Sequence, residues 1–291
     1  MRSAVDSFSP TMLDQTVLAK PYFEQAGLLM AVDDSLPVGF VHAGFAPNRE
    51  LSDLDHSIGI ISQLKVVDVE SRDTVASELL ERACDYVRNK GAQQIYFGSQ
   101  YPYSPFYLGL YGGAQLGGVL DEDEHVVRAL QTAGFEAKEK IVTYSRTLAG
   151  FRTAVNRQQM SIRRQFKINA IADPLETSWW ESCTFGLAER DCFHALPKNS
   201  NDIVGTAKFW DIQPLANKWG VASRGLHEFE IAPEHFGTGL DLFLLGESLR
   251  HLMQSRIGLV EILCRESDHA LQACLNTLGF TAGVTSTQMV K

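Results

Sequence analysis

A glycine-containing segment in the second half of the chain constrains the fold more than any other feature. Residues 226–240 read Leu-His-Glu-Phe-Glu-Ile-Ala-Pro-Glu-His-Phe-Gly-Thr-Gly-Leu, which is typical of a strand, a tight loop and the start of a helix. Gly237 and Gly239 let the backbone turn sharply and approach a ligand closely. The helix start offers unpaired N–H groups and the positive end of the helix dipole. The segment therefore predicts an anion site suited to a pyrophosphate.

The spacing argues against the common phosphate-binding motifs. A Walker loop continues with Gly-Lys-Ser/Thr, and no such triplet follows Gly239. A dinucleotide fingerprint has a third glycine at the helix start, where this chain has Asp241. The simplest alternative is a glycine turn that only starts a helix.

The loop and its surroundings resemble the GCN5-related N-acetyltransferase (GNAT) family. Residues 231–240 follow Ile-x-Pro-x-x-aromatic-Gly-x-Gly-Leu, which is similar to that family's acetyl-CoA pyrophosphate loop. Phe236 stands where the family has Arg or Gln, and Asp241 where it has Gly or Ala. A strand-like run at 257–263 and a helical segment at 267–280 that ends in Gly-Phe follow in the family's order. The resemblance covers about residues 162–291.

The N-terminal half repeats this order. A strand at 58–67, a helix at 74–90, a strand at 94–97, a helix at 122–132 and a strand at 141–148 are expected from the hydrophobic spacing. The first-half helix also ends in Gly-Phe, and the two Phe residues lie 145 positions apart, from Phe135 to Phe280. A terminal strand, Thr285 to Val290, is expected to close the second half as 141–148 closes the first.

These patterns predict an α/β fold of two tandem GNAT-like domains, each a mixed, mainly antiparallel central sheet flanked by helices. The expected parts are an N-terminal domain at 1–150, a basic linker at 151–161 and a C-terminal domain at 162–291. The first domain carries a degenerate cofactor loop, because Thr74 replaces the glycine and acidic residues surround it. The second domain is therefore expected to bind acetyl-CoA.

The resemblance implies that acetyl-CoA serves as co-substrate, with no metal. The implied cofactor-binding residues are Ile231, Ala232, Phe236, Gly237, Thr238, Gly239, Leu240 and Asp241. A backbone N–H near Ile231 or Ala232 would polarise the thioester carbonyl. Cys183, Cys192 and His194 fall in one segment, but their spacing does not resemble a zinc site.

The implied reaction is direct attack of an amine on the thioester, with no acyl-enzyme. Glu228 or Glu230 is the candidate general base, because an ammonium acceptor must lose a proton before it attacks. Strand alternation predicts that Leu226, Glu228 and Glu230 share one face. Cys274 occupies the position of the family's tyrosine, which protonates the leaving thiolate. The alternative for Cys274 is a small core residue.

Two functions of different class follow. One is an acyl-CoA-dependent N-acetyltransferase that acts on a small-molecule or peptide amine. The other is a non-catalytic protein that binds acyl-CoA or a partner through a retained GNAT fold. The aromatic segment 101–113 is expected either to fill the seam between the domains or to wall an acceptor pocket. The sequence leaves open whether the chain is a monomer or a homodimer.

Charge and composition bear on the partners and the cellular location of the protein. Residues 1–150 hold 12 Lys and Arg against 20 Asp and Glu, and residues 151–291 hold 14 against 15, so a nucleic-acid partner is not expected. The acidic first half could attract a cationic acceptor or only solvate a surface. Cations at 151–170 could reach the CoA phosphates near the domain seam or pair with the acidic domain. Five cysteines, no signal-like start and no long apolar run lead us to expect a cytoplasmic protein without membrane contact.

Overall fold

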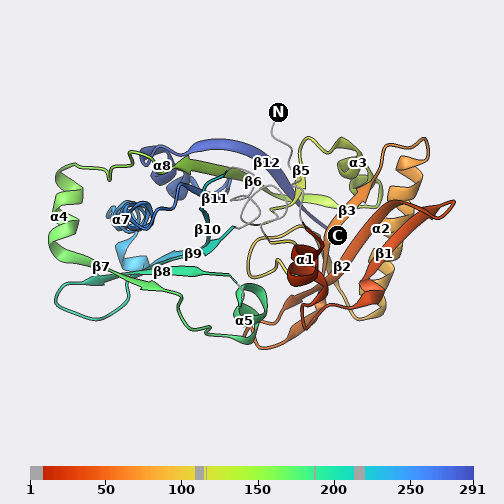
Figure 1. Ribbon diagram of the computed structural model, residues 1–291, viewed down its shortest axis with the longest axis horizontal. Coiled ribbons are helices and arrows are strands. Elements are labelled where there is room, and N and C mark those ends of the chain that lie inside the picture. Colours follow the sequence, from red (N-terminus) through yellow and green to blue (C-terminus); the bar gives the residue numbers. More distant parts are fainter. Residues whose placement is uncertain (1–8, 109–114, 116, 187, 213–219) are drawn as a thin grey trace.

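One continuous sheet runs through the molecule, with helices against its faces (Figure 1). The computed structural model describes residues 9–108, 115, 117–186, 188–212 and 220–291. Among these residues the sheet has twelve strands: β1 (Leu28–Asp33), β2 (Leu36–Pro47), β3 (Leu54–Val66), β4 (Gln94–Phe97), β5 (Val119–Leu120), β6 (Glu136–Thr147), β7 (Phe166–Ala172), β8 (Arg190–Pro197), β9 (Gly205–Asp211), β10 (Ser223–Ile231), β11 (Leu259–Arg265) and β12 (Thr281–Val290). The strand order is β1-β2-β3-β4-β12-β6-β11-β10-β9-β8-β7, and β5 pairs with β12.

The helices cover this sheet in two groups, one for each half of the chain. The α-helices are α1 (Pro10–Leu13), α2 (Arg72–Asn89), α3 (Glu124–Thr132), α4 (Arg157–Gln165), α5 (Trp179–Phe185), α7 (Leu240–Gln254) and α8 (His269–Thr277). A π-helical turn at Asp14–Leu18 and 3₁₀ turns at Gln25–Gly27 and Pro233–His235 complete the described elements. The α/β architecture of the sequence analysis is confirmed, with each expected strand and helix present.

The apolar spacing of the long helices explains where they pack. In α2 the residues at helical spacing, Ala76, Leu79, Leu80, Ala83, Cys84 and Val87, are buried against strands of the first half. In α7 a wider apolar face that includes Leu244, Leu245 and Leu249 is buried in the second core. Each half therefore has its own hydrophobic core beneath its cofactor-loop helix or the counterpart of that helix.

The two halves exchange their last strands, which corrects the expectation that each closes its own unit. From the first half, β6 pairs antiparallel with β11, from Leu259↔Thr147 to Arg265↔Ile141. From the second half, β12 reaches β4, with Met289 opposite Phe97. The cores follow this exchange, because Met289 packs in the first-half core and Tyr144 and Leu148 pack in the second. The limits of the two expected domains, 1–150 and 162–291, stay a prediction. Their sheets are joined because β6 pairs with the second half and β12 with the first.

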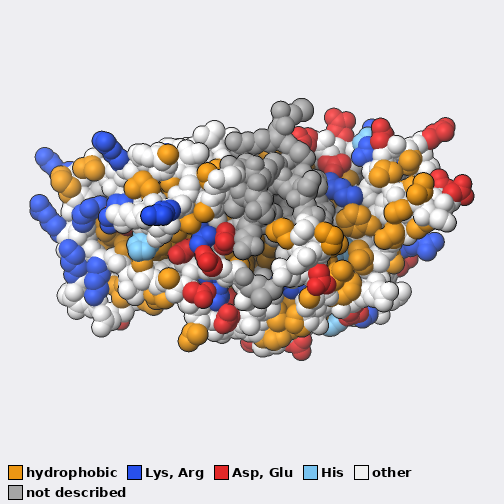
Figure 2. Space-filling view, in the orientation of Figure 1, with side chains coloured by type: hydrophobic (Ala, Val, Ile, Leu, Met, Phe, Trp, Pro, Cys, Tyr) orange, Lys and Arg blue, Asp and Glu red, His pale blue; other side chains and the backbone are white. Residues whose placement is uncertain are grey.

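The basic linker forms a helix at the outer end of the molecule rather than at the seam, which corrects its expected place. Figure 1 shows α4 at the opposite end from α2 and β1, and it packs against α7 and β7. Arg163 of α4 forms an ion pair with Glu247 of α7. Figure 2 shows Lys and Arg side chains gathered at the α4 end and Asp and Glu prominent at the other. The described cations of α4 therefore lie far from the acidic half.

Candidate functional site

A cleft opens in the sheet where β10 separates from β11. The two strands pair in parallel only from Ser223↔Leu259 to Leu226↔Ile262, although β10 continues to Ile231. On its other edge β10 stays paired with β9 as far as Ile231↔Gly205. Beyond Leu226, therefore, one edge of β10 has no neighbouring strand among the described residues.

A β-bulge at His227 lies where this separation begins. Leu226 is opposite Phe209 of β9 and Glu228 is opposite the next residue, Lys208, so His227 is the extra residue. Leu226 and Glu228 consequently lie on opposite faces, and the expectation that they share one is wrong. Glu228 and Glu230 do share a face, because their partners Lys208 and Thr206 are two positions apart.

The backbone at the open edge offers hydrogen-bond donors. The Ala232 N–H donates to the Val204 carbonyl at 2.9 Å, so it points to β9 and away from the cleft. In an antiparallel ladder the N–H groups of successive residues point to opposite edges. The N–H groups of Ile231 and Phe229 therefore point into the cleft. Of the two residues expected near the thioester carbonyl, the geometry favours Ile231 over Ala232.

A cavity of about 580 Å³ occupies the cleft between the end of β10, the glycine loop and the start of α8. Its lining residues are Phe229, Glu230, Ile231, His235, Phe236, Gly237, Asp241, Asp268, Ala270 and Leu271. Five of the expected site residues are thus brought together here: Glu230, Ile231, Phe236, Gly237 and Asp241. The cavity also has an acidic side, formed by Glu230, Asp241 and Asp268, which the sequence analysis did not assign as a group.

The glycine loop has the conformation that its sequence predicts. Gly237 and Gly239 have φ angles of +71° and +87°, a region that side-chain-bearing residues rarely adopt. A Cβ added to Gly237 would meet nothing within 4 Å, so this glycine borders open space. Within the described part of the chain, the N–H groups of Gly237 and Gly239 have no hydrogen-bond partner. The loop therefore presents donors at the start of α7.

Six expected site residues lie outside the cavity lining: Glu228, Ala232, Thr238, Gly239, Leu240 and Cys274. Leu240 is fully buried beneath the loop, and Thr238 hydrogen-bonds through its hydroxyl to the His235 carbonyl at 2.7 Å. Cys274 is buried in the second core with Leu275 and Leu278 of the same segment, as the core alternative predicts. Burial raises the pKa of the Cys274 thiol, and the nearby Asp241 raises it further. The role of Cys274 as a proton donor stays a prediction.

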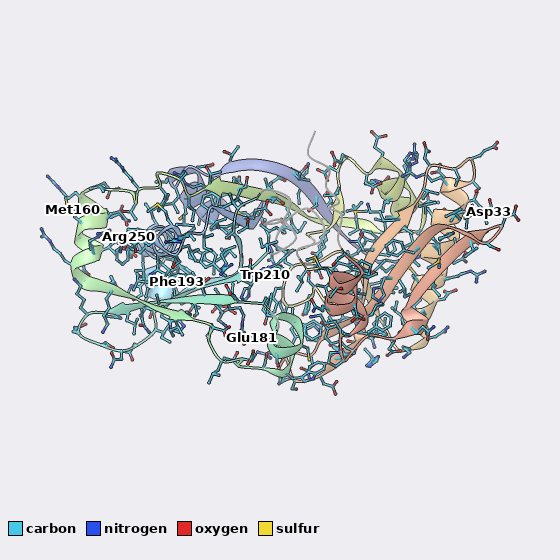
Figure 3. The ribbon with its side chains drawn as sticks, viewed as in Figure 1. Asp33, Met160, Glu181, Phe193, Trp210 and Arg250 are labelled. Carbon is cyan, nitrogen blue, oxygen red and sulfur yellow. The ribbon has the colours of Figure 1, made fainter. Side chains whose placement is uncertain are left out.

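Glu228 belongs to a chain of charged side chains on the sheet face opposite α7. Its Oε2 lies 3.0 Å from the Lys208 Nζ, and Lys208 lies 3.9 Å from Glu181 of α5. Arg190 continues the chain, 3.4 Å from Glu181. Burial raises the pKa of Glu228, and Lys208 partly offsets this by favouring the carboxylate. Figure 3 shows Glu181 on α5, below the centre of the molecule. Lys208 and Glu181 were not predicted from the sequence. Alternation along β9 puts Lys208 on the same face as Trp210, on a strand next to β10.

His227 and the aromatic segment meet behind the bulge. The His227 ring is buried, 4.4 Å from Phe185 and 5.3 Å from Tyr101 by ring centroids. Burial lowers the pKa of His227 to about 3, with Lys208 and Arg190 acting in the same direction. Tyr101, Phe106, Tyr107 and Leu108 are packed in clusters that include Trp180 or Phe185 of the second half. The described part of the segment thus fills the seam, and residues 109–113 lie outside the described residues.

The first half contains the counterpart of this cleft in a closed form. There β3 and β4 pair in parallel only as far as Ile61↔Phe97, and Ser62 is the bulge residue. Lys65, three residues after that bulge, corresponds to Glu230, and Asp123, the residue that precedes α3, corresponds to Asp268, which precedes α8. Lys65 Nζ and Asp123 Oδ2 lie 2.6 Å apart. An ion pair therefore spans the first-half cleft.

The described part of the chain gives two further findings. None of its helices is long and apolar enough to cross a membrane. Within the same residues, no group of three or more His, Cys, Asp and Glu side chains is placed to hold a metal ion.

The fold is similar to those of several solved proteins. No protein-family model and no curated protein matches the chain. Among solved structures it is similar to a tandem GNAT protein from the clavulanic acid biosynthesis pathway, with a TM-score of 0.63, 13% identity and coverage of 99% of this chain and 90% of that chain. A glucosamine N-acetyltransferase region of a fungal GH3 β-N-acetylglucosaminidase gives a TM-score of 0.67 at 15% identity, covering 97% of this chain and 36% of that one. A GCN5-related N-acetyltransferase from Sphaerobacter thermophilus gives 0.61 at 13% identity, covering 91% and 80%. The chain therefore has the fold of the GCN5-related N-acetyltransferases in a tandem arrangement.

Proposed function

We propose that the protein transfers an acyl group from acyl-CoA, with acetyl-CoA as the first candidate, to an amine by direct attack in the second-half cleft. The observation that carries this proposal is the separation of β10 from β11 beside an open glycine loop. The cavity of about 580 Å³ there has room for the pantetheine arm, with the phosphates at the loop.

Backbone donors support the binding of the thioester end. The N–H groups of Phe229 and Ile231 face the open edge of β10 and can hydrogen-bond the amides of an extended pantetheine arm, as a strand would. A donor on this edge also stabilises the negative charge that develops on the thioester oxygen during attack. The loop N–H groups of Gly237 and Gly239 are available to the pyrophosphate.

The charges of the site support an ammonium acceptor. Glu228 lies on the face opposite α7, where burial raises the pKa of its carboxyl. A carboxylate with a raised pKa is a better base, and it can take the proton that an ammonium must lose, directly or through water. The free amine then forms the C–N bond as the C–S bond breaks. The nitrogen is positively charged after the C–N bond forms and releases its second proton to solvent. The departing thiolate takes a proton from solvent or from Cys274, which solvent then reprotonates.

The first test is isothermal titration of acetyl-CoA into the wild-type protein and a Gly237→Trp variant. The bulky side chain would project into the cavity, so we expect wild type to bind and the variant to lose binding. Gly150→Trp is the matched control, because Gly150 has a φ of +69°, no atom within 4 Å of an added Cβ and no place in the cavity lining. Loss of binding in both variants would point to backbone strain, and no binding by wild type would reject the proposal.

A non-catalytic acyl-CoA-binding or partner-binding role is the second candidate. The acidic cavity wall of Glu230, Asp241 and Asp268 favours it, because carboxylates repel phosphates. The calorimetric titration shows whether acetyl-CoA binds. A screen of amines, in which release of the free CoA thiol is measured, shows whether bound acetyl-CoA is turned over. Binding without thiol release by any amine in the screen would support this second role.

A further inference from the structure

We propose that Gln158 and Gln159 of α4 are positioning residues that orient the backbone amides of the cofactor loop toward the pyrophosphate. This inference rests on the proposed function, because it needs an acyl-CoA in the second-half cleft. It brings the linker helix, which contributes no residue to the cavity lining, into the binding of the cofactor.

Two side-chain hydrogen bonds connect α4 to the loop. Gln158 Nε2 donates to the Thr238 carbonyl at 2.7 Å, and Gln159 Nε2 donates to the Gly239 carbonyl at 2.9 Å. A Cβ on Gly239 would lie 3.1 Å from both amide groups. Gly239 is therefore required by its φ angle and also by the close approach of these two glutamines.

The helix that carries the glutamines is itself held in place. The Asn156 side chain caps α4 by accepting a hydrogen bond from the Gln159 N–H at 2.8 Å. Ile162 is buried in the second core, and Arg163 pairs with Glu247 of α7. The glutamine side chains thus extend from a fixed backbone rather than from a free linker.

Fixing a carbonyl also fixes the N–H of the same planar peptide, because the two groups point in opposite directions. The Thr238 carbonyl shares its peptide with the Gly239 N–H, and the Gly239 carbonyl shares its peptide with the Leu240 N–H. The glutamines therefore hold both N–H groups directed away from α4. Donors that are fixed before the ligand arrives bind it with less loss of entropy.

Because the cavity wall is acidic, binding of the pyrophosphate depends on the orientation of the backbone N–H groups. Phe236 supplies no cation at the loop, and Glu230, Asp241 and Asp268 line the same cavity. The side-chain amides of Gln158 and Gln159 are neutral, so they donate to the loop carbonyls without adding the charge that an Arg or Lys would add. Exposed Arg157, Arg164 and Lys167 on and after α4 add a positive field at this end of the molecule. Figure 3 marks this end by Met160 of α4 and Arg250 of α7.

The test uses Gln158→Leu, Gln159→Leu and the double variant, each titrated with CoA by calorimetry and with pantetheine by NMR. Pantetheine lacks the pyrophosphate, so it reports on the cleft alone. We expect the double variant to bind CoA roughly 10- to 30-fold more weakly, from about fivefold for each hydrogen bond, with pantetheine binding unchanged. Gln165→Leu is the control on the same helix, because within the described part of the chain the Gln165 side chain hydrogen-bonds to Ser161 alone.

The outcomes separate this inference from the proposed function. Equal weakening for CoA and pantetheine would show that the glutamines only support the fold, and unchanged CoA affinity would remove their role altogether. If the wild-type protein binds neither compound, the proposed function fails and this inference fails with it. Selective loss of CoA binding, with unfolding temperatures equal to that of Gln165→Leu, would establish the positioning role.

Discussion

Lys65 and Asp123 form an ion pair across the first-half cleft, with 2.6 Å between Nζ and Oδ2. The corresponding residues of the second half, Glu230 and Asp268, are both acidic and both line the open cavity. Two carboxylates repel each other, so they cannot form the bridge that spans the first cleft. We therefore expect the difference between the bridged and the open cleft to depend in part on the charge at position 230.

The variant Glu230→Lys tests this relationship. A lysine at this position would face Asp268 as Lys65 faces Asp123, and we expect the new pair to close the cavity and weaken acetyl-CoA binding at least tenfold. Glu230→Gln is the control, because it removes the carboxylate without supplying a cation. Calorimetric titration of both variants gives the comparison. Tighter binding by Glu230→Lys would instead mean that the lysine meets a phosphate and that the cleft stays open.

The sequence predicts the cofactor loop well because its signals are local. Gly237 and Gly239 adopt the positive φ angles that only glycine adopts readily, and the helix that they start is present as expected. The apolar spacing of residues 74–90 likewise predicts α2 to within two residues of each end. Such features depend on neighbours in the chain, which the sequence displays directly.

The features that the sequence analysis missed depend on distant partners. The residues at 281–290 do not reveal that this strand pairs with β4 rather than within its own half. Their side-chain pattern fits a sheet with either neighbouring strand. The bulge at His227 reverses the faces of Leu226 and Glu228, and a period-two pattern cannot reveal one inserted residue. Lys208 becomes part of the site only when β9 and β10 are aligned in register.

Lys208 is expected to set the protonation of Glu228. Burial raises the pKa of Glu228 and the Lys208 ammonium, 3.0 Å away, opposes that rise. In Lys208→Met the opposing charge is gone, so the pKa of Glu228 should rise further. The acidic limb of an acetyl-transfer pH–rate profile would then move to higher pH, and a ¹³C titration of the glutamate carboxyl reports the same change without an acceptor. Lys208→Arg should restore the wild-type limb. A limb that stays in place in Lys208→Met would show that another group controls the rate.

Met289, near the C-terminal end of the chain, is expected to stabilise the N-terminal half. Its side chain is 3% exposed and packs in the first-half core. Met289→Ala should lower the free energy of unfolding by roughly 2–4 kcal/mol, as for a large-to-small core substitution. Hydrogen exchange should be faster at β4, which is paired with β12. Met160→Ala, at a residue that is 50% exposed, should change stability by less than about 0.5 kcal/mol. Faster exchange confined to α7 and α8 would contradict the strand exchange.

The buried His227 should make the protein less stable in acid. Burial lowers the pKa of His227 to about 3 in the folded protein, whereas an unfolded histidine titrates near 6.5. Between these values the unfolded chain binds the additional proton, so the free energy of unfolding falls as the pH falls below about 6.5. The loss is on the order of 3 kcal/mol by pH 4, at about 1.4 kcal/mol per pH unit.

His227→Leu tests this directly. Both ring nitrogens lack a hydrogen-bond partner among the described residues, so an apolar replacement should leave stability at pH 7 unchanged or slightly higher. Urea unfolding at pH 7 and pH 4.5 should then show a smaller acid loss than in wild type. The acid loss that remains should fall again on His42→Leu, because burial lowers the pKa of His42 to about 4. An acid loss as large in His227→Leu as in wild type would mean that His227 is protonated in the folded protein or does not contribute to the acid transition.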